Sequence, residues 1–170
     1  MELLRQKSRT SIIQVMAAEF QIARTPDQIG AVCELFREYA DGLGLDLCFQ
    51  HFDEELATLP GKYAEPRGRL YLLVENGVYA GCGALRPFHD EFAELKRLYI
   101  RPAFRNRGFG RLISQRLIDD ARQIGCRAVV LDTLRTMKEA LALYASLGFR
   151  ETAPYYHNPS PEVCYMRLDL

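Results

Sequence analysis

The sequence has little that would place the protein in a membrane or on a nucleic acid. Its 170 residues carry 22 Lys and Arg against 22 Asp and Glu, so the formal net charge is zero. No apolar run approaches a membrane span, and the start lacks the apolar core and small-residue cleavage site of a secretory signal. Nucleic acids normally need an extended positive face. We therefore expect a cytoplasmic protein that binds neither membrane nor nucleic acid.

The cysteines exclude two further classes of protein. They are odd in number and none stands in C-x-x-C spacing: Cys33, Cys48, Cys82, Cys126 and Cys164. We therefore expect neither a disulfide framework nor a bound metal, and reduced thiols fit the cytoplasm. Cys82 and Cys164 are the rivals for a covalent reaction, but no His or Asp spacing supports either.

Length and composition fit one domain. Hydrophobic residues make up 48% of the chain and charged residues 26%, which is ordinary for a globular protein. A chain of this length can bury most of its apolar surface. We place a single domain at residues 19–170. Residues 1–18 form an N-terminal extension of unknown role, within which Met16 is an alternative start.

The residues before position 60 indicate a strand followed by two helices. The strand is predicted over 20–23. Thr25 to Gln28 then form a capping box, and apolar residues at helical spacing continue to the glycines at 42 and 44. A second, short helix is predicted from near Asp53 to just before Pro60.

Three antiparallel strands follow, and the third is irregular. Strands over 69–75 and 78–85 flank Asn76-Gly77, the strongest short signal for a β-hairpin. The next strand shifts its apolar face by one residue between Leu95 and Leu98. This pattern is typical of a β-bulge, which leaves backbone N–H and C=O groups unpaired.

The turn after this strand is rich in arginine and glycine. Its amides at Gly108, Phe109 and Gly110 would lie at the start of a helix, where free donors and the helix dipole attract an anion. The turn is therefore a predicted anion site. Six cations stand around it in the sequence: Lys96, Arg97, Arg101, Arg105, Arg107 and Arg111.

Three kinds of site compete for this turn. A Walker loop is excluded because Gly-Lys-Ser/Thr is absent. A dinucleotide fold would use Asp132, at the end of the next strand, for a ribose contact, but its third glycine is missing and the upstream strands form a hairpin. A basic, solvated helix start is the alternative to a diphosphate site, although it leaves the bulge and the paired glycines unrelated.

The second half of the chain predicts a βαβ unit and then a helix and a strand. Apolar residues at helical spacing lead to Gly125, a helix stop. The continuously apolar strand over 127–132 suits the centre of a parallel sheet. A capping box at 136–139 begins a helix that ends at Gly148, and the last strand covers 163–168.

Two motifs in this order resemble the GNAT superfamily of N-acyltransferases. Arg105-x-x-Gly108-x-Gly110 is similar to the family's acyl-CoA pyrophosphate signature. Residues 142–149, Ala-Leu-Tyr-Ala-Ser-Leu-Gly-Phe, are similar to its Leu-Tyr…Gly-Phe motif. Stretches at 59–63, 84–87 and 155–166 resemble a bacterial-type group of small GNAT proteins.

The resemblance implies an α/β (α+β) fold and an acetyltransferase. The mixed sheet would have about six to seven strands, antiparallel in its first half and splayed between the fourth and fifth, with about four helices. The reaction implied is direct transfer of an acetyl group from acetyl-CoA to a primary amine of a small molecule or peptide. No metal and no covalent enzyme intermediate are expected.

The same resemblance assigns residues to the cofactor. The backbone of Leu98 and Ile100 would bond the pantetheine arm or the acetyl carbonyl, as in β-augmentation. The pyrophosphate would be bound by the turn, that is Arg105, Asn106, Arg107, Gly108, Phe109 and Gly110.

Two catalytic residues also follow from the resemblance. Tyr144 matches the tyrosine that reaches the thioester sulfur, and is the candidate general acid. Its spacing alone would make it a core residue with a satisfied hydroxyl. Glu94 matches a strand position that supplies a base in some relatives, directly or through water. The alternative for Glu94 is a salt bridge to Lys96 or Arg97.

The acceptor side of the site is less defined. By resemblance, residues 45–52 line the amine pocket; otherwise they form a hydrophobic plug beneath the helices. Tyr155, Tyr156 and Arg86 either shape that pocket or belong to a packed cap. His89 is left outside the site as a lone loop histidine.

Two other functions and a homodimer are alternatives that the sequence leaves open. A GNAT-fold module would hold acyl-CoA without transferring it, and a Rossmann-type domain would prefer NAD. A final strand at the sheet edge would allow a homodimer.

Overall fold

The computed structural model describes residues 18–44, 51–89 and 91–170. The strands are β1 (Ala18–Ile22), β2 (Arg69–Glu75), β3 (Val78–Phe88), β4 (Phe92–Ile100), β5 (Ala128–Leu134), β6 (Arg150–Glu151) and β7 (Val163–Asp169). The α-helices are α1 (Pro26–Leu43), α2 (Phe52–Thr58), α3 (Phe109–Ile124) and α4 (Lys138–Ser146). Two short 3-10 helices are η2 (Gly61–Tyr63) and η3 (Pro102–Phe104).

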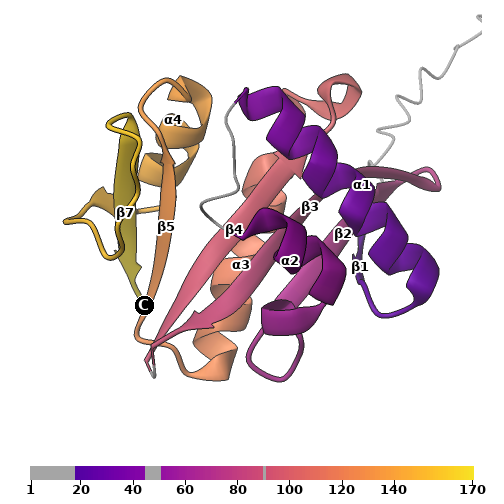
Figure 1. The fold of residues 1–170 in the computed structure, drawn as a ribbon, viewed down its shortest axis with the longest axis horizontal. Helices are drawn as coiled ribbons and strands as arrows, with labels where there is room; N and C mark the ends of the chain where they lie inside the picture. Colours follow the sequence, from indigo (N-terminus) through magenta and orange to yellow (C-terminus); the bar gives the residue numbers. More distant parts are fainter. Residues whose placement is uncertain (1–17, 45–50, 90) are drawn as a thin grey trace, which may run out of the picture.

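The strands form one mixed sheet in the order β1-β2-β3-β4-β5-β7-β6. β1 to β4 are antiparallel neighbours, β4 and β5 are parallel, and β7 is antiparallel to both β5 and β6. α3 connects the two parallel strands, as Figure 1 shows. The predicted mixed sheet, antiparallel in its first half and followed by a βαβ unit, is confirmed.

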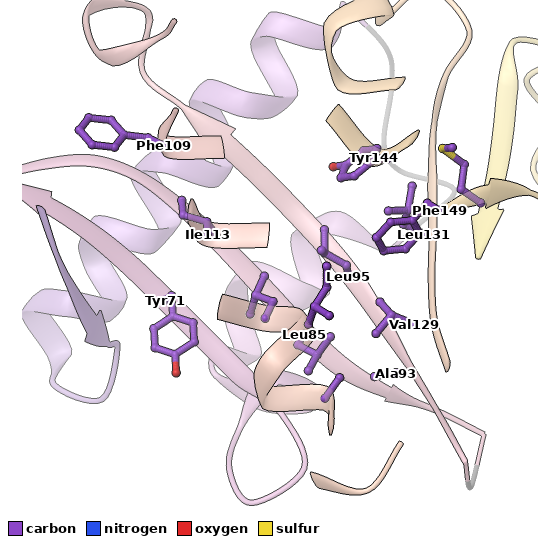
Figure 2. Close-up of a cluster of buried hydrophobic side chains, with 14 of the residues drawn as sticks. Tyr71, Leu85, Ala93, Leu95, Phe109, Ile113, Val129, Leu131, Tyr144 and Phe149 are labelled. Carbon is purple, nitrogen blue, oxygen red and sulfur yellow. The ribbon is translucent and has the colours of Figure 1, made fainter. Parts of the chain in front are cut away.

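Helices cover both faces of the sheet (Figure 1). On the face of α1 and α2, Phe36 is fully buried in a cluster that includes Leu72 of β2. On the opposite face, Ile113 of α3 is buried with Leu95 of β4 (Figure 2). Full burial of one such side chain stabilises the fold by about 1.5–3 kcal/mol, so two apolar layers hold the sheet between them.

The two predicted capping boxes have different outcomes. At α1, the Gln28 amide donates to Thr25 Oγ1 (3.3 Å) and the Thr25 amide donates to Gln28 Oε1 (3.1 Å), as predicted. At α4 the prediction is wrong, because the helix starts one residue later, with Met137 at the N-cap and no side-chain cap. Met137 Sδ lies 3.7 Å from Thr133 Oγ1 and lines the space between β4 and β5. The side chain of Met137 thus contacts β5, and the helix begins at the next residue, Lys138.

β4 carries the predicted β-bulge. The register between β3 and β4 shifts at Cys82/Ala84, so one residue of β3 faces both Arg97 and Leu98. Arg97 has a φ of 58°, a left-handed backbone that is uncommon outside glycine. The extra residue directs Lys96 and Arg97 to the α2 face and returns Leu98 to the α3 core.

The sheet splays between β4 and β5, as predicted. These strands pair only from Phe92–Ala128 to Glu94–Val130, whereas β5 is paired with β7 along its whole length. Beyond Glu94, no strand of the described residues pairs with the second half of β4 on that side. The sheet opens next to the bulge.

The ends of the sheet differ from the prediction. β6 pairs with β7 at Arg167 and Met166, so the prediction that the final strand is a free edge for a second copy is wrong. The chain folds back on itself after α4 and covers that edge. β1 starts at Ala18, and the rest of the predicted N-terminal extension lies outside the described residues. Within the described ranges, no helix is long and apolar enough to cross a membrane.

Candidate active site

The predicted anion site lies at the start of α3. Gly108 is the N-cap with a φ of 80°, and no side chain caps the helix. The Leu112 amide donates to Gly108 O (3.0 Å) and is the first to find an acceptor within the helix. The amides of Phe109, Gly110 and Arg111 therefore have no intrahelical acceptor and point out of the positive end of the helix dipole.

The arginines of the turn make few contacts with carboxylates. Arg105 is exposed, its Nε donates to Ile100 O (2.9 Å), and its guanidinium lies 5.8 Å from the centre of the Tyr99 ring. Arg107 pairs with Glu75. These two arginines can therefore reach an anion at the helix start.

Three of the six predicted cations lie elsewhere. Arg101 pairs with Glu34 (2.8 Å) and Glu38 (2.7 Å) of α1. Lys96 and Arg97 face α2, because the bulge turns both toward that side. The prediction that all six surround the turn is therefore wrong. The turn keeps Arg105, Arg107 and Arg111.

A cleft of about 90 Å³ lies where β4 and β5 separate. Leu98 lines it from β4, Asp132 and Thr133 line it from β5, and Tyr144 lines it from α4. Ile100, which we predicted beside Leu98, does not line this cleft, and its carbonyl accepts from Arg105. The cleft therefore provides a space beside the unpaired half of β4.

Tyr144 combines a buried ring with an unpaired hydroxyl. Its ring is 6% exposed and lies 5.7 Å from that of Phe149 (Figure 2). The hydroxyl has no hydrogen bond to any described residue. The hydroxyl is also partly accessible. Among the described residues, Ser114 Oγ is the one side-chain polar atom that is both fully enclosed and without a partner. Burial raises the pKa of Tyr144 above its ordinary value, with smaller effects from Tyr39 and Asp132.

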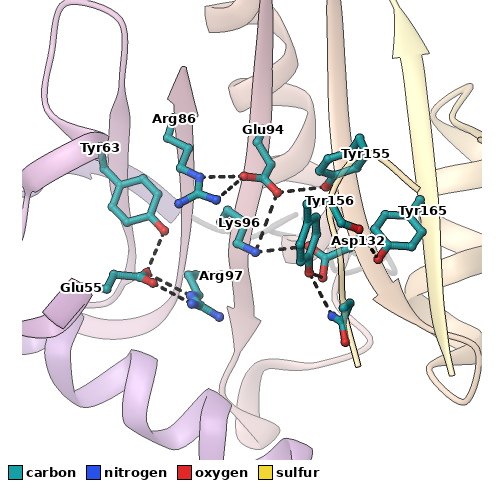
Figure 3. Close-up of polar contacts among 11 residues, drawn as sticks. Glu55, Tyr63, Arg86, Glu94, Lys96, Arg97, Asp132, Tyr155, Tyr156 and Tyr165 are labelled. Atoms are coloured by element: carbon teal, nitrogen blue, oxygen red, sulfur yellow. Dashed lines mark hydrogen bonds and ion pairs between the residues drawn. The ribbon is translucent and has the colours of Figure 1, made fainter. Parts of the chain in front are cut away.

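Glu94 lies at the last paired position before the splay and is 1% exposed. Its Oε2 accepts from Arg86 Nε (2.6 Å), and its Oε1 accepts from the Tyr155 hydroxyl (2.9 Å) (Figure 3). Lys96 Nζ lies 3.8 Å from Oε1. Of the two predicted salt bridges, the one to Lys96 is present as a long contact and the one to Arg97 is absent. Arg86 is the main partner.

A second pocket of about 380 Å³ lies beside the cleft, between β4 and the α2–η2 segment. Glu94, Arg86, Tyr156 and His51 line it, and its other walls include Tyr63 and Phe88. Lys96 and Arg97 line both the pocket and the cleft. The predicted acceptor loop, residues 45–52, lies outside the described residues apart from His51 and Phe52.

Asp132 was predicted only as a ribose ligand of an alternative fold. Its Oδ1 accepts from Lys96 Nζ (3.2 Å) and its Oδ2 accepts from the Tyr156 hydroxyl (2.7 Å). Burial raises the pKa of Asp132, but Lys96 and Tyr156 outweigh burial and hold that pKa below its ordinary value. Figure 3 shows Lys96 between Asp132 and Glu94, as a bridge between β4 and β5.

Sequence reasoning also missed the partner of Arg97. Its Nε and Nη2 donate to the two oxygens of Glu55 in α2, at 3.0 and 2.6 Å, and the Tyr63 hydroxyl donates to the same carboxylate (2.7 Å). Burial raises the pKa of Glu55, yet the Arg97 guanidinium more than offsets this and lowers it. The sequence around Glu55 gave little sign of this pair, because α2 has three acidic residues in its first turn and nothing local distinguishes Glu55 from the other two.

The alternatives to this arrangement lack support in the geometry. Cys82 and Cys164 are buried and line neither cavity, and burial raises the pKa of the Cys82 thiol above its ordinary range. His89 is exposed beside Phe88. In the part of the chain that the structure describes, no three His, Cys, Asp or Glu side chains gather to hold a metal.

Comparisons with known proteins agree on one family. The model of the acetyltransferase (GNAT) family matches residues 30–149. An uncharacterized N-acetyltransferase of Schizosaccharomyces pombe is 42% identical over 149 residues, covering 86% of this chain and 91% of that protein. An acetyltransferase from Streptococcus agalactiae has the same fold, with a TM-score of 0.75 and 20% identity over 90% of this chain and 98% of that one.

A third protein adds a bound cofactor. A GNAT family acetyltransferase from Elizabethkingia anophelis, solved with acetyl-CoA bound, has a TM-score of 0.54 and 26% identity, covering 61% of this chain and 76% of that one. The Rossmann alternative is wrong, because the sheet is antiparallel in its first half and the family model spans both motifs. From its sheet, its two motifs and its relatives, the chain belongs to the GNAT family of acetyltransferases and is an acyltransferase.

Proposed function

We propose that the protein transfers the acetyl group of acetyl-CoA directly to a primary amine of a small molecule or peptide. The observation that carries this proposal is the meeting of two cavities at the bulge of β4. The cleft contains Tyr144, the pocket contains Glu94, and Lys96 and Arg97 line both. An acyl donor in the cleft and an amine in the pocket would meet there.

The start of α3 would bind the pyrophosphate of the cofactor. Its free amides and the dipole favour an anion, and Arg105 and Arg107 add positive charge. Asn106, with a φ of 60°, would help the turn to close around the phosphates. The backbone of Leu98, which lines the cleft, would bond the pantetheine arm, and that of Ile100 follows two residues further along β4. The acetyl-CoA bound in the Elizabethkingia relative supports acetyl-CoA as the cofactor.

Tyr144 would act on the leaving sulfur. The amine nitrogen attacks the acetyl carbon, the C–S bond breaks, and the thiolate takes the hydroxyl proton of Tyr144, which solvent then replaces. Because burial raises the pKa of Tyr144, the hydroxyl is protonated at neutral pH and first stabilises the sulfur as a hydrogen-bond donor. Positioning by the two cavities supplies the rest of the rate, without a covalent enzyme intermediate.

Glu94 would take the proton of the attacking amine, directly or through water in the pocket. An alkylammonium with a pKa of roughly 10.4 must lose a proton before it can attack. Arg86 Nη2 lies 2.6 Å from Glu94 Oε2, and Lys96 Nζ lies 3.8 Å from Glu94 Oε1. Because both oxygens of Glu94 already accept hydrogen bonds, from Arg86 and Tyr155, a water relay suits the geometry.

The test is amine-dependent release of the CoA thiol across a panel of primary amines, with the acetylated product identified by mass spectrometry. Release with at least one amine would support transfer. Binding of acetyl-CoA without product from any amine would indicate a module that holds acyl-CoA, and the absence of binding would remove the cofactor assignment.

A further inference from the structure

The acceptor pocket has a balanced set of largely buried charges. Arg86, Lys96 and Arg97 line it, and each of these cations faces a carboxylate. Glu54 and Lys62 also line the pocket, whereas Asp132 lines the cleft. These paired charges select neither an ammonium nor a carboxylate as ligand. The unused hydrogen-bond donors of the cations are more informative than the net charge. The three carboxylates belong to Glu94, Asp132 and Glu55.

The buried carboxylates already have protein partners. Both oxygens of Glu55 accept hydrogen bonds, and so do both oxygens of Glu94 and of Asp132. Each carboxylate can accept further hydrogen bonds, and the exposed Glu54 also lines the pocket. The carboxylates therefore leave room for the amine of a ligand.

The cations also keep unused donors. An arginine side chain has five N–H groups and a lysine has three. Arg97 uses Nε and Nη2 on Glu55, and Arg86 uses Nε and Nη2 on Glu94. In both, Nη1 has no partner among the described residues, and Figure 3 shows it pointing away from the carboxylate.

These donors lie in open space within a nearly buried setting. The side chain of Arg97 is 3% exposed and that of Lys96 is 7% exposed. Arg97 Nη1 is not among the fully enclosed polar atoms that lack a partner, and Arg97 lines both the pocket and the cleft, so this N–H group borders open space there. A ligand oxygen bound there would form charge-assisted hydrogen bonds away from bulk water, which are stronger than neutral ones.

We propose that the acceptor is a primary amine that also carries a carboxylate, and that the free donors of Arg86 and Arg97 bind this carboxylate. This inference rests on the proposed function and names its substrate class. The amine would then point toward the bulge, where the pocket meets the cleft. Tyr63, Phe88 and Tyr156 also line the pocket and provide aromatic surface for an apolar or aromatic side chain.

The first test measures binding and does not require transfer. Wild-type protein is titrated calorimetrically with 3-phenylpropanoate and, separately, with 3-phenylpropanamide, in which the carboxylate is replaced by a neutral amide. We expect the acid to bind about tenfold or more tightly, as for hydrogen bonds between charged groups. Equal affinities, or no binding of either compound at about 10 mM, would overturn the proposal.

The second test measures transfer with a matched pair of amines. We expect kcat/KM for L-phenylalanine to exceed that for L-phenylalaninamide by about tenfold or more. The amide has the less basic amine, so the chemical bias runs against this result. Equal values would refute the carboxylate site while leaving acetyl transfer intact. No product from any amine, with 3-phenylpropanoate still bound, would refute the proposed function alone.

A variant tests the assignment to Arg97. Arg97→Lys keeps a positive charge opposite Glu55 but removes the distal guanidinium nitrogen. We expect it to reduce the preference for acid over amide, mainly through KM of the acid. The matched control is Arg101→Lys, which lies outside both cavities. Equal weakening of acid and amide by Arg97→Lys would remove Arg97 from the site, and the wild-type comparisons do not depend on this variant folding.

Discussion

Tyr144 shows how one residue can satisfy two interpretations of a sequence. Its place on an apolar helical stripe predicts a core residue, and its ring is buried against Phe149. Its motif position predicts a proton donor, and its hydroxyl faces the cleft without a partner. The two are compatible because a tyrosine has an apolar body and a polar tip. The alternative, a core residue with a satisfied hydroxyl, lacks support because the hydroxyl has no hydrogen-bond partner among the described residues.

We expect Tyr144→Phe to lower turnover by about 10- to 100-fold while the affinity for acetyl-CoA is unchanged, because only the proton donor is lost. Steady-state thiol release and calorimetric titration with acetyl-CoA measure the two effects. Tyr79→Phe is the control, since Tyr79 lines neither cavity. Unchanged turnover in Tyr144→Phe would exclude it as the acid.

Glu94→Gln tests the proposed base at nearly constant shape. We expect turnover to fall about tenfold or more if Glu94 accepts the amine proton. Removing the negative charge opposite Arg86 should also lower the free energy of unfolding by about 1–3 kcal/mol. Turnover is compared at saturating amine, and stability by urea denaturation. Glu91→Gln, an exposed change in the turn before β4, is the control. If Glu94→Gln turns over at the wild-type rate, water and not Glu94 accepts the proton of the amine.

At the scale of elements, the start of α3 is the proposed anion site, because its first turn is left uncapped. Gly108 reaches a left-handed backbone that a side chain would strain, and its helix has no competing cap. The other end of α3 has the same backbone feature, since Gly125 has a φ of 91°. α3 therefore has the glycine of the proposed anion site, Gly108, at one end and a control glycine, Gly125, at the other.

We expect Gly108→Ala and Gly125→Ala each to lower the free energy of unfolding by about 1–2 kcal/mol, because both force alanine into the left-handed region. Only Gly108→Ala should weaken acetyl-CoA binding, since only this end faces the pyrophosphate. Urea denaturation and calorimetry separate the two effects. If both variants bind acetyl-CoA equally well, the anion site is not at the start of α3.

α2 is held to the sheet by the pair of Glu55 and Arg97, and this gives a pH dependence. Glu55 has a pKa below its ordinary value in the folded protein. A lowered folded pKa stabilises the protein above the unfolded pKa of about 4.3, and the benefit is lost as pH falls through the folded value.

We expect Glu55→Gln to lower the free energy of unfolding at pH 7 by about 2–4 kcal/mol, since Arg97 then stays buried beside a neutral group. The variant should also lose less stability than wild type between about pH 5 and pH 3. Urea denaturation at each pH measures this. Glu54→Gln, exposed on the same helix, should behave like wild type. Parallel pH curves for Glu55→Gln and wild type would contradict the assignment.

At the scale of the whole molecule, the sheet has two parts joined by a short parallel ladder. β4 and β5 pair from Phe92–Ala128 to Glu94–Val130, and Lys96 bridges the gap beyond by contacting Asp132 and Glu94. A ligand in the cleft would contact both parts, so its binding should stabilise the whole fold.

We expect saturating acetyl-CoA to raise the melting temperature, because a ligand at about 100 times its Kd adds about 2.7 kcal/mol to the stability of the folded state. CoA should have a similar effect, since it has the same diphosphate and pantetheine. NAD, which lacks the pantetheine arm, should have little effect. A shift with NAD alone would contradict the cofactor assignment.

The sequence by itself determined most of the elements, the bulge and the family, because these depend on local periodicity and short motifs. The shift between Leu95 and Leu98 is readable in the strand itself. The tertiary structure alone decided which charges pair: Arg97 with Glu55, Lys96 with Asp132, and Arg86 with Glu94. The physical reason is that one extra residue in β4 redirects two cations across the sheet, toward partners that only the packing of α2 and β5 brings within reach.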